Sequence, residues 1–90
     1  MTATKEQRRS LKYIRLAAHL AAQPAEIVTL VMTLQEIELL VGTTLPSGAR
    51  FPSWWRNDEH RAHSSAWLSA GWRVEEVSRR PSQVAFVRSA

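Results

Sequence analysis

The residues best suited by type to do chemistry lie between Asn57 and Ser64. His60 and His63 are three positions apart, so they share a helix face, and Glu59 precedes His63 by four positions. That spacing could hold a metal ion, but the chain lacks both the HExxH order of helical zinc sites and any cysteine. His63 also falls on the apolar side of the expected helix, which favours a hydrogen-bonded core histidine. We therefore expect no metal and no other cofactor.

Other catalytic arrangements each lack a necessary part. Ser64 lies one helical turn from His60, but no oxyanion hole is indicated for serine catalysis. Glu75 and Glu76 alternate faces of an expected strand, so they do not converge on one ion. The three glycines are scattered rather than gathered in a phosphate-binding loop, and the absence of cysteine excludes thiol catalysis and disulfides. We expect a binding protein and not an enzyme.

Arginine and lysine supply the chemistry that remains. The 90-residue chain has a formal net charge of +4, and its 12 Lys and Arg fall in two zones, five in residues 5–15 and seven from Arg50 to Arg88. Residues 16–49 contain none. Two basic zones around a neutral-to-acidic middle are typical of a surface that binds a polyanion, and we expect double-stranded DNA as the partner. A merely solvated surface is the alternative.

The apolar segments are too short or too interrupted for targeting or for a membrane. Arg15 and His19 break the alanine-rich run that would otherwise resemble a signal peptide. No stretch approaches the ~18 apolar residues of a membrane span. With 44% hydrophobic residues in 90 positions, we expect one cytoplasmic domain over residues 1–90, with residues 1–4 disordered and no membrane partner.

The N-terminal third has the pattern of an amphipathic helix. Thr4 and Gln7 form a capping-box pattern, which predicts a helix from near Lys5 to a point before Pro24. One arc of this helix is apolar and would face the core. The opposite arc is basic and holds Lys5, Arg8, Arg9, Lys12, Arg15 and His19.

A strand and a second helix follow. Residues 26–32 are rich in β-branched side chains and too few for a stable helix, so we expect a strand there. Thr33 and Glu36 form a second capping box, and Gly42 is suited to end a helix. We therefore predict a helix over residues 34–41.

The next segment combines a long loop with a third helix. Residues 43–57 contain prolines, serines and a glycine, which is typical of a loop. Asn57 or Asp58 can cap a helix that runs to Ala70 and ends at Gly71. On this helix the alanines and Trp67 would face inward. The solvent side would hold Arg61, Ser64, Ser65 and Leu68.

The chain ends in a predicted hairpin, with strands at 72–78 and 83–88 joined through Arg79, Arg80, Pro81 and Ser82. The order helix, strand, helix, helix, strand, strand is that of a winged helix. The predicted class is therefore α+β, with three helices and a small antiparallel three-stranded sheet. The long loop departs from the 3–4-residue turn of a helix-turn-helix.

DNA contacts can be assigned by element on this fold. The first helix and the hairpin, as a wing, would hold phosphates, and the third helix would meet base edges with short polar side chains and one arginine. The role would be that of a transcriptional regulator or a mobile-element accessory factor. The candidate DNA-binding residues are Arg8, Lys12, Arg15, Arg50, Arg56, Arg61, Ser64, Ser65, Arg79 and Arg80.

The tryptophan pair supports an alternative function. Adjacent side chains on an extended segment point opposite ways, so one of Trp54 and Trp55 is expected in the core and the other at the surface. An exposed tryptophan among arginines is the composition of an interface hot spot. The alternative is an interaction module that binds a second copy of itself or a host protein through this pair. A single-strand or RNA binder, with the tryptophan stacked on a base, lies between the two hypotheses.

The spacing of the tryptophans resembles a small uncharacterised domain family of bacteria and phages. The shared pattern is LPxxAR, WWxN, HSxAWLxAGWxV and VxF, over about residues 10–88. The chain departs from it at Gly48 and Phe51, where the family is more variable or polar. The resemblance implies a recurring fold and a mobile-element setting, without a mechanism. The matching positions to watch are Arg50, Trp54, Trp55, Asn57, His63 and Ser64.

Overall fold

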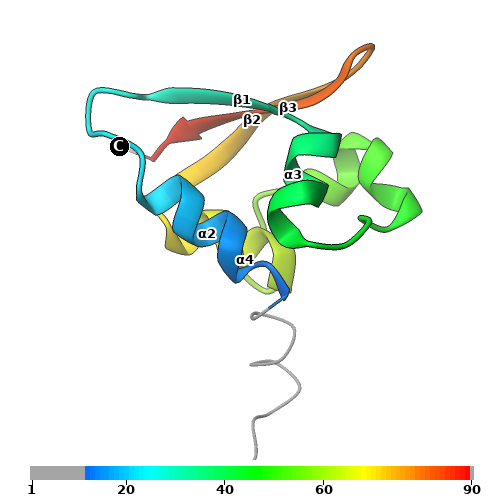
Figure 1. The fold of residues 1–90 in the computed structure, drawn as a ribbon, viewed down its shortest axis with the longest axis horizontal. Helices are drawn as coiled ribbons and strands as arrows, with labels where there is room; N and C mark the ends of the chain where they lie inside the picture. The colour runs from blue at the N-terminus through cyan, green and yellow to red at the C-terminus, as the bar shows by residue number, and fades with distance from the viewer. Residues whose placement is uncertain (1–11, 90) are drawn as a thin grey trace, which may run out of the picture.

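The computed structural model describes residues 12–89 of the chain. In chain order (Figure 1), the elements are α2 (Ile14–Ala21), β1 (Thr29–Thr33), α3 (Leu34–Val41), the 3-10 helices η1 (Ser47–Arg50) and η2 (Pro52–Trp55), α4 (Ala62–Ser69), β2 (Trp72–Arg79) and β3 (Ser82–Arg88). The predicted α+β class, with three helices and a three-stranded antiparallel sheet, is confirmed. None of the described helices has the length and apolar character needed to cross a membrane. The predicted helix start near Lys5, and Arg8 with it, lie outside the described residues.

The sheet has the strand order β1-β3-β2, and both outer strands run antiparallel to β3. The last strand in sequence is thus the central one, and Val84 is paired with Met32 on one side and with Val77 on the other. Figure 1 shows the sheet along one side of the molecule and the three helices gathered on the other. Because side chains alternate along a strand, Val84 and Phe86 both point into the core, where they are fully buried.

The second predicted helix is confirmed as α3, including both of its ends. The backbone N–H of Glu36 donates to Thr33 Oγ1 at 3.0 Å, and that of Thr33 donates to Glu36 Oε1 at 2.8 Å, which completes the capping box. These bonds favour the carboxylate and lower the pKa of Glu36. Gly42 follows at φ +89° and Gly71, after α4, at φ +85°, a backbone conformation that glycine adopts without strain.

The long loop predicted over residues 43–57 contains the two 3-10 helices η1 and η2. Pro52 occupies the start of η2, where its fixed φ is suitable and its missing N–H costs nothing. The indole N–H of Trp55 donates to the carbonyl of Ala49 at 2.6 Å, and both residues are buried. This bond links η2 to η1, so the η1–η2 segment is packed into the domain and is not a free loop.

The predicted start of the third helix is wrong. α4 begins at Ala62, because the two residues expected to cap it are used elsewhere. Asp58 Oδ1 accepts from the backbone N–H of His60 at 3.0 Å, which closes a local turn. The side-chain amide of Asn57 bonds the backbone of Val74 instead.

The first strand was predicted to begin at Glu26, but β1 begins three residues later, at Thr29. The preceding connection folds onto the C-terminal strand, where the Arg88 guanidinium lies 4.6 Å from the ring centroid of Trp72. From there Arg88 donates at 2.8–2.9 Å to three carbonyl oxygens, those of Gln23, Pro24 and Ile27. This arginine therefore links β3 to the segment that joins α2 and β1.

The core is a layer of aromatic rings between the sheet and the helices. Trp55 and Trp67 stack with centroids 5.4 Å apart, and Phe86 meets Trp67 edge-on at 5.9 Å. Trp72 is also fully buried, and its indole N–H donates to the carbonyl of Leu20 at 2.9 Å. Each ring buries a large apolar area and, where it carries an N–H, satisfies it. The layer holds η2, α4 and the hairpin in one arrangement.

Candidate nucleic-acid interface

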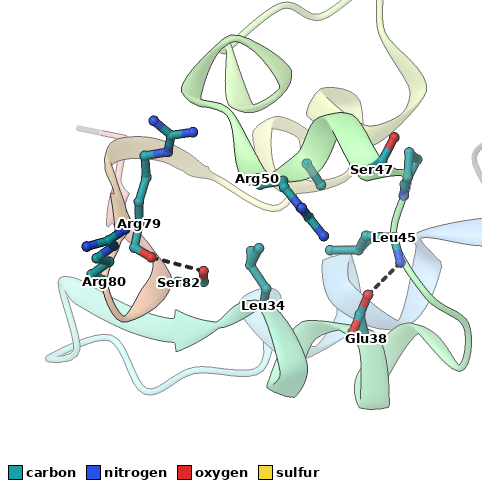
Figure 2. Close-up of a pocket in the computed structure, with 10 residues that line it drawn as sticks. Leu34, Glu38, Leu45, Ser47, Arg50, Arg79, Arg80 and Ser82 are labelled. Atoms are coloured by element: carbon teal, nitrogen blue, oxygen red, sulfur yellow. Dashed lines mark hydrogen bonds between the residues drawn. The ribbon is translucent and has the colours of Figure 1, made fainter.

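A cavity of about 820 Å³ separates the β2–β3 hairpin tip from η1. Figure 2 shows Arg79 and Arg80 on one side of this space and Arg50 on the other. Residues that the sequence separates by about thirty positions thus meet at one site. Its full lining is Leu34, Glu38, Leu45, Pro46, Ser47, Ala49, Arg50, Arg79, Arg80 and Ser82.

Glu38 brings a carboxylate to the same cavity. Its Oε2 accepts from the backbone N–H of Leu45 at 2.8 Å, as Figure 2 shows, which fixes the chain where it enters η1. Sequence reasoning did not single out Glu38, because a glutamate on an acidic helix gives no sign of what it will face. Three arginines and one glutamate line the cavity, so the residues around it carry an excess of positive charge.

The three arginines of this cavity are free to bind an external anion. All three are exposed. Within residues 12–89 the ion pairs are Arg61 with Asp58 at 3.5 Å and His60 with Glu59 at 4.0 Å, so none involves Arg50, Arg79 or Arg80. A guanidinium group without a carboxylate partner offers its N–H fork to phosphate.

A second cavity, of about 350 Å³, borders the η1–η2 segment. Arg56 and Arg61 supply its charge, and Phe51 and Trp54 supply aromatic walls. The remaining lining residues are Gly48 and Ser53. Both cavities fall within the range of about 300–1,000 Å³ typical of ligand sites.

Phe51 joins the two cavities. Its ring lines the second cavity, and the Arg79 guanidinium of the first lies 5.1 Å from its centroid. We therefore treat both cavities as one arginine surface, defined by Arg50, Arg56, Arg61, Arg79 and Arg80.

The described cations of α2 and its N-terminal flank do not line this surface. The Lys12 ammonium lies 5.6 Å from the ring centroid of Tyr13. Arg15 Nη1 lies 4.0 Å from the position that a β-carbon on Gly42 would occupy. The guanidinium therefore sits at the C-terminal end of α3, whose last turn has no basic residue of its own and whose dipole favours a cation there. Arg15 therefore lies apart from the residues that line the two cavities.

Ser64 corrects the predicted recognition surface of α4. The sequence placed it on the solvent side, but it is 0% exposed, and its hydroxyl donates to the carbonyl of Arg56. The bond ties α4 to the chain after η2 and leaves no hydroxyl for a base edge. Ser65 is half-buried, and α4 itself carries no lysine or arginine. Arg56 and Arg61 lie in the connection that precedes it.

The tryptophan pair divides between the core and a half-buried position, although it lies in the 3-10 helix η2 and not on the predicted extended segment. Trp55 is 2% exposed and belongs to the core, so it is not available to a partner protein. Trp54 is half-buried and stacks on the His63 ring, with centroids 3.9 Å apart and planes 5° from parallel. The interaction site predicted from both rings is therefore reduced to one edge of Trp54.

His63 is held as a neutral structural residue. Its Nε2 lies 2.7 Å from the carbonyl oxygen of Trp54, and since a carbonyl only accepts, Nε2 carries the proton. Partial burial beneath Trp54 lowers the pKa of His63, and this effect outweighs the opposing hydrogen bond. Among residues 12–89 no three histidine or carboxylate groups gather as metal ligands.

We expect the lowered pKa of His63 to make the fold sensitive to acid. The unfolded chain binds a proton near the ordinary value of 6.5, whereas the folded chain resists it, so the unfolded state gains protons first. The free energy of unfolding should be highest above pH 6.5 and fall as pH decreases below it. Urea unfolding from about pH 8 to about pH 5 measures this loss.

Two variants control that measurement. His63→Gln removes the titrating ring, so its stability is lower throughout but flatter over the same pH range. His60→Gln changes an exposed histidine and keeps the wild-type slope. A His63→Gln profile as steep as that of the wild type would show that another group titrates.

A family model matches residues 13–90 of the chain, and its description reads domain of unknown function (DUF7662). No curated protein and no solved structure matches the chain.

Proposed function

This chain belongs to the DUF7662 family, and we propose that it binds double-stranded DNA through its arginine surface. The observation that carries the proposal is that Arg50, Arg79 and Arg80 line one cavity and have no ion-pair partners within the described residues. Such groups bind phosphate in pairs or clusters. Arg56 and Arg61 extend the charge across the η1–η2 segment.

The fold supports this placement. We take the element order and the antiparallel hairpin as those of a winged helix, in which Arg79 and Arg80 would stand at the wing tip. In the proposed complex the wing and η1 contact a DNA strand from two sides, and its phosphates lie in the cavity between them. The buried Ser64 and the absence of a cation from α4 argue against base reading by that helix. Binding is therefore expected to depend on the DNA backbone more than on sequence.

Fluorescence anisotropy of a labelled duplex, titrated at several salt concentrations, tests the proposal. Each phosphate contact adds close to one unit to the slope of log affinity against log salt, so Arg79→Ala/Arg80→Ala is expected to lower that slope by about 2. The affinity of the double variant for the duplex at low salt should also be lower than that of the wild type.

Arg73→Ala is the matched control. Arg73 is an exposed arginine of the same hairpin that lines neither cavity, so its loss should change the slope little. If the double variant and the control have the same slope, the wing takes no part. If wild-type protein does not bind duplex DNA at low salt, the proposed function is wrong.

A further inference from the structure

We infer that the second cavity takes an unpaired nucleobase, so that the preferred DNA carries an unpaired nucleotide beside a duplex. The inference rests on the proposed function and adds a substrate class to it. Its basis is one exposed aromatic ring, that of Phe51, at the centre of the arginine surface.

Phe51 is unlike every other aromatic residue in the described part of the chain. Its side chain is 46% exposed, whereas the other rings are buried or half-buried. An exposed aromatic ring among cationic side chains offers a surface on which a base can stack. Here Arg79 lies over the ring and the cavity residues Arg56 and Arg61 lie nearby.

The backbone holds this ring in a defined position. Phe51 is the extended residue between η1 and η2, with φ −107° and ψ 141°. Its N–H donates to the carbonyl of Gly48 at 3.0 Å, and its carbonyl accepts from the N–H of Trp54 at 3.1 Å. A ring fixed at both backbone groups needs little ordering when a ligand stacks on it.

The lining of the second cavity has the composition of a base-binding site. Phe51 and Trp54 present aromatic surface, Ser53 offers a hydroxyl, and Gly48 adds no side chain to fill the space. A positively charged groove with aromatic side chains is the arrangement on which single-stranded bases stack. Arg56 can hold a phosphate beside the base, whereas Arg61 is already paired with Asp58 at 3.5 Å.

Only a base outside the helix can use this cavity. A paired base is covered on both faces by its neighbours, so a protein ring reaches it only after the base leaves the stack. A base that is already unpaired does not have to leave a stack, so binding it does not cost the unstacking energy. The geometry thus favours a bulge or a junction over a continuous duplex, while the first cavity continues to bind the duplex backbone.

The test compares a fully paired duplex with the same duplex carrying one extrahelical 2-aminopurine. We expect wild-type protein to bind the bulged DNA on the order of tenfold tighter, because stacking on an aromatic ring is worth that much per base. Stacking on Phe51 should also quench 2-aminopurine emission. Phe51→Leu is expected to lose both the preference for the bulged DNA and the quenching, and Phe51→Tyr is expected to keep both.

Leu39→Ala is the matched control, since Leu39 is exposed and lines neither cavity, and it should keep the preference. Equal affinity of the wild type for both DNAs, or a preference that survives in Phe51→Leu, would overturn the inference and leave duplex binding intact. Failure to bind either DNA would overturn the proposed function together with it.

Discussion

Trp67→Ala is expected to lower the free energy of unfolding by about 3–5 kcal/mol. Trp67 is 0% exposed and lies between Trp55 at 5.4 Å and Phe86 at 5.9 Å, so its removal leaves a void in the aromatic layer. A domain of 90 residues has a total stability of roughly 5–13 kcal/mol. The substitution therefore removes a large share, and part of the population should be unfolded at physiological temperature.

Urea unfolding followed by far-ultraviolet circular dichroism measures this loss. Leu39→Ala serves as the control, because Leu39 is 77% exposed and its truncation should change the stability by no more than about 0.5 kcal/mol. Trp67→Phe keeps a ring in the layer and should lie between the two. A loss below about 1 kcal/mol for Trp67→Ala would contradict the packing described above.

Asn57→Ala is expected to have the second-largest effect, a loss of about 2–3 kcal/mol. The Asn57 amide makes the pair of backbone hydrogen bonds that a neighbouring strand would otherwise make. Its Nδ2 donates to the carbonyl of Val74 at 2.9 Å, and its Oδ1 accepts from the N–H of Val74 at 2.8 Å. The same Oδ1 accepts from the indole N–H of Trp67 at 2.9 Å. Alanine would leave all three groups without these partners, at the irregularity between Val74 and Glu76 in β2.

Asn57→Asp separates the accepted bonds from the donated one. The carboxylate still accepts from Val74 and Trp67, but it cannot donate to the carbonyl of Val74, so an intermediate loss is expected. Denaturant unfolding of both variants provides the values. A double-mutant cycle of Asn57→Ala with Trp67→Phe should show a coupling of about 1 kcal/mol, since both remove the same hydrogen bond. Additive losses would show that this bond contributes nothing.

The features predicted correctly are those that depend on neighbours in the sequence. The capping box of Thr33 and Glu36 spans four residues, and the glycines at Gly42 and Gly71 end helices through their own backbone conformation. The hairpin is likewise local, because its two strands are adjacent in the sequence. The order of the elements followed from these local signals. Such signals act before tertiary contacts form, so a single sequence is enough to find them.

The features that were missed depend on contacts between distant segments. Asn57 looks like a helix cap, but a stronger pair of hydrogen bonds is available to it at Val74, seventeen positions away. Ser64 looks like a surface residue on a short polar helix, but the carbonyl of Arg56 needs a donor in the interior. In each case a polar side chain satisfies a buried backbone group, and the sequence does not show where that group will lie.

The same distinction applies to the candidate site. The sequence identified all five arginines of the surface as DNA-binding candidates, because charge is visible without a fold. The sequence could not show that Arg50 and Arg79 line the same cavity, since that depends on where the hairpin tip lies relative to η1. It also counted Arg15 with them, and Arg15 lines neither cavity.

The central position of β3 has a consequence for synthesis on the ribosome. β1 and β2 leave the exit tunnel first, and each has β3 as its partner in the sheet. Until residues 82–88 also leave the tunnel, β1 and β2 have unpaired edges, and Trp72 lacks the Arg88 side chain that lies over it. The sheet therefore closes only after β3 emerges, and any delay between the emergence of β1 and that of β3 prolongs the exposure of unpaired strands to aggregation and chaperones.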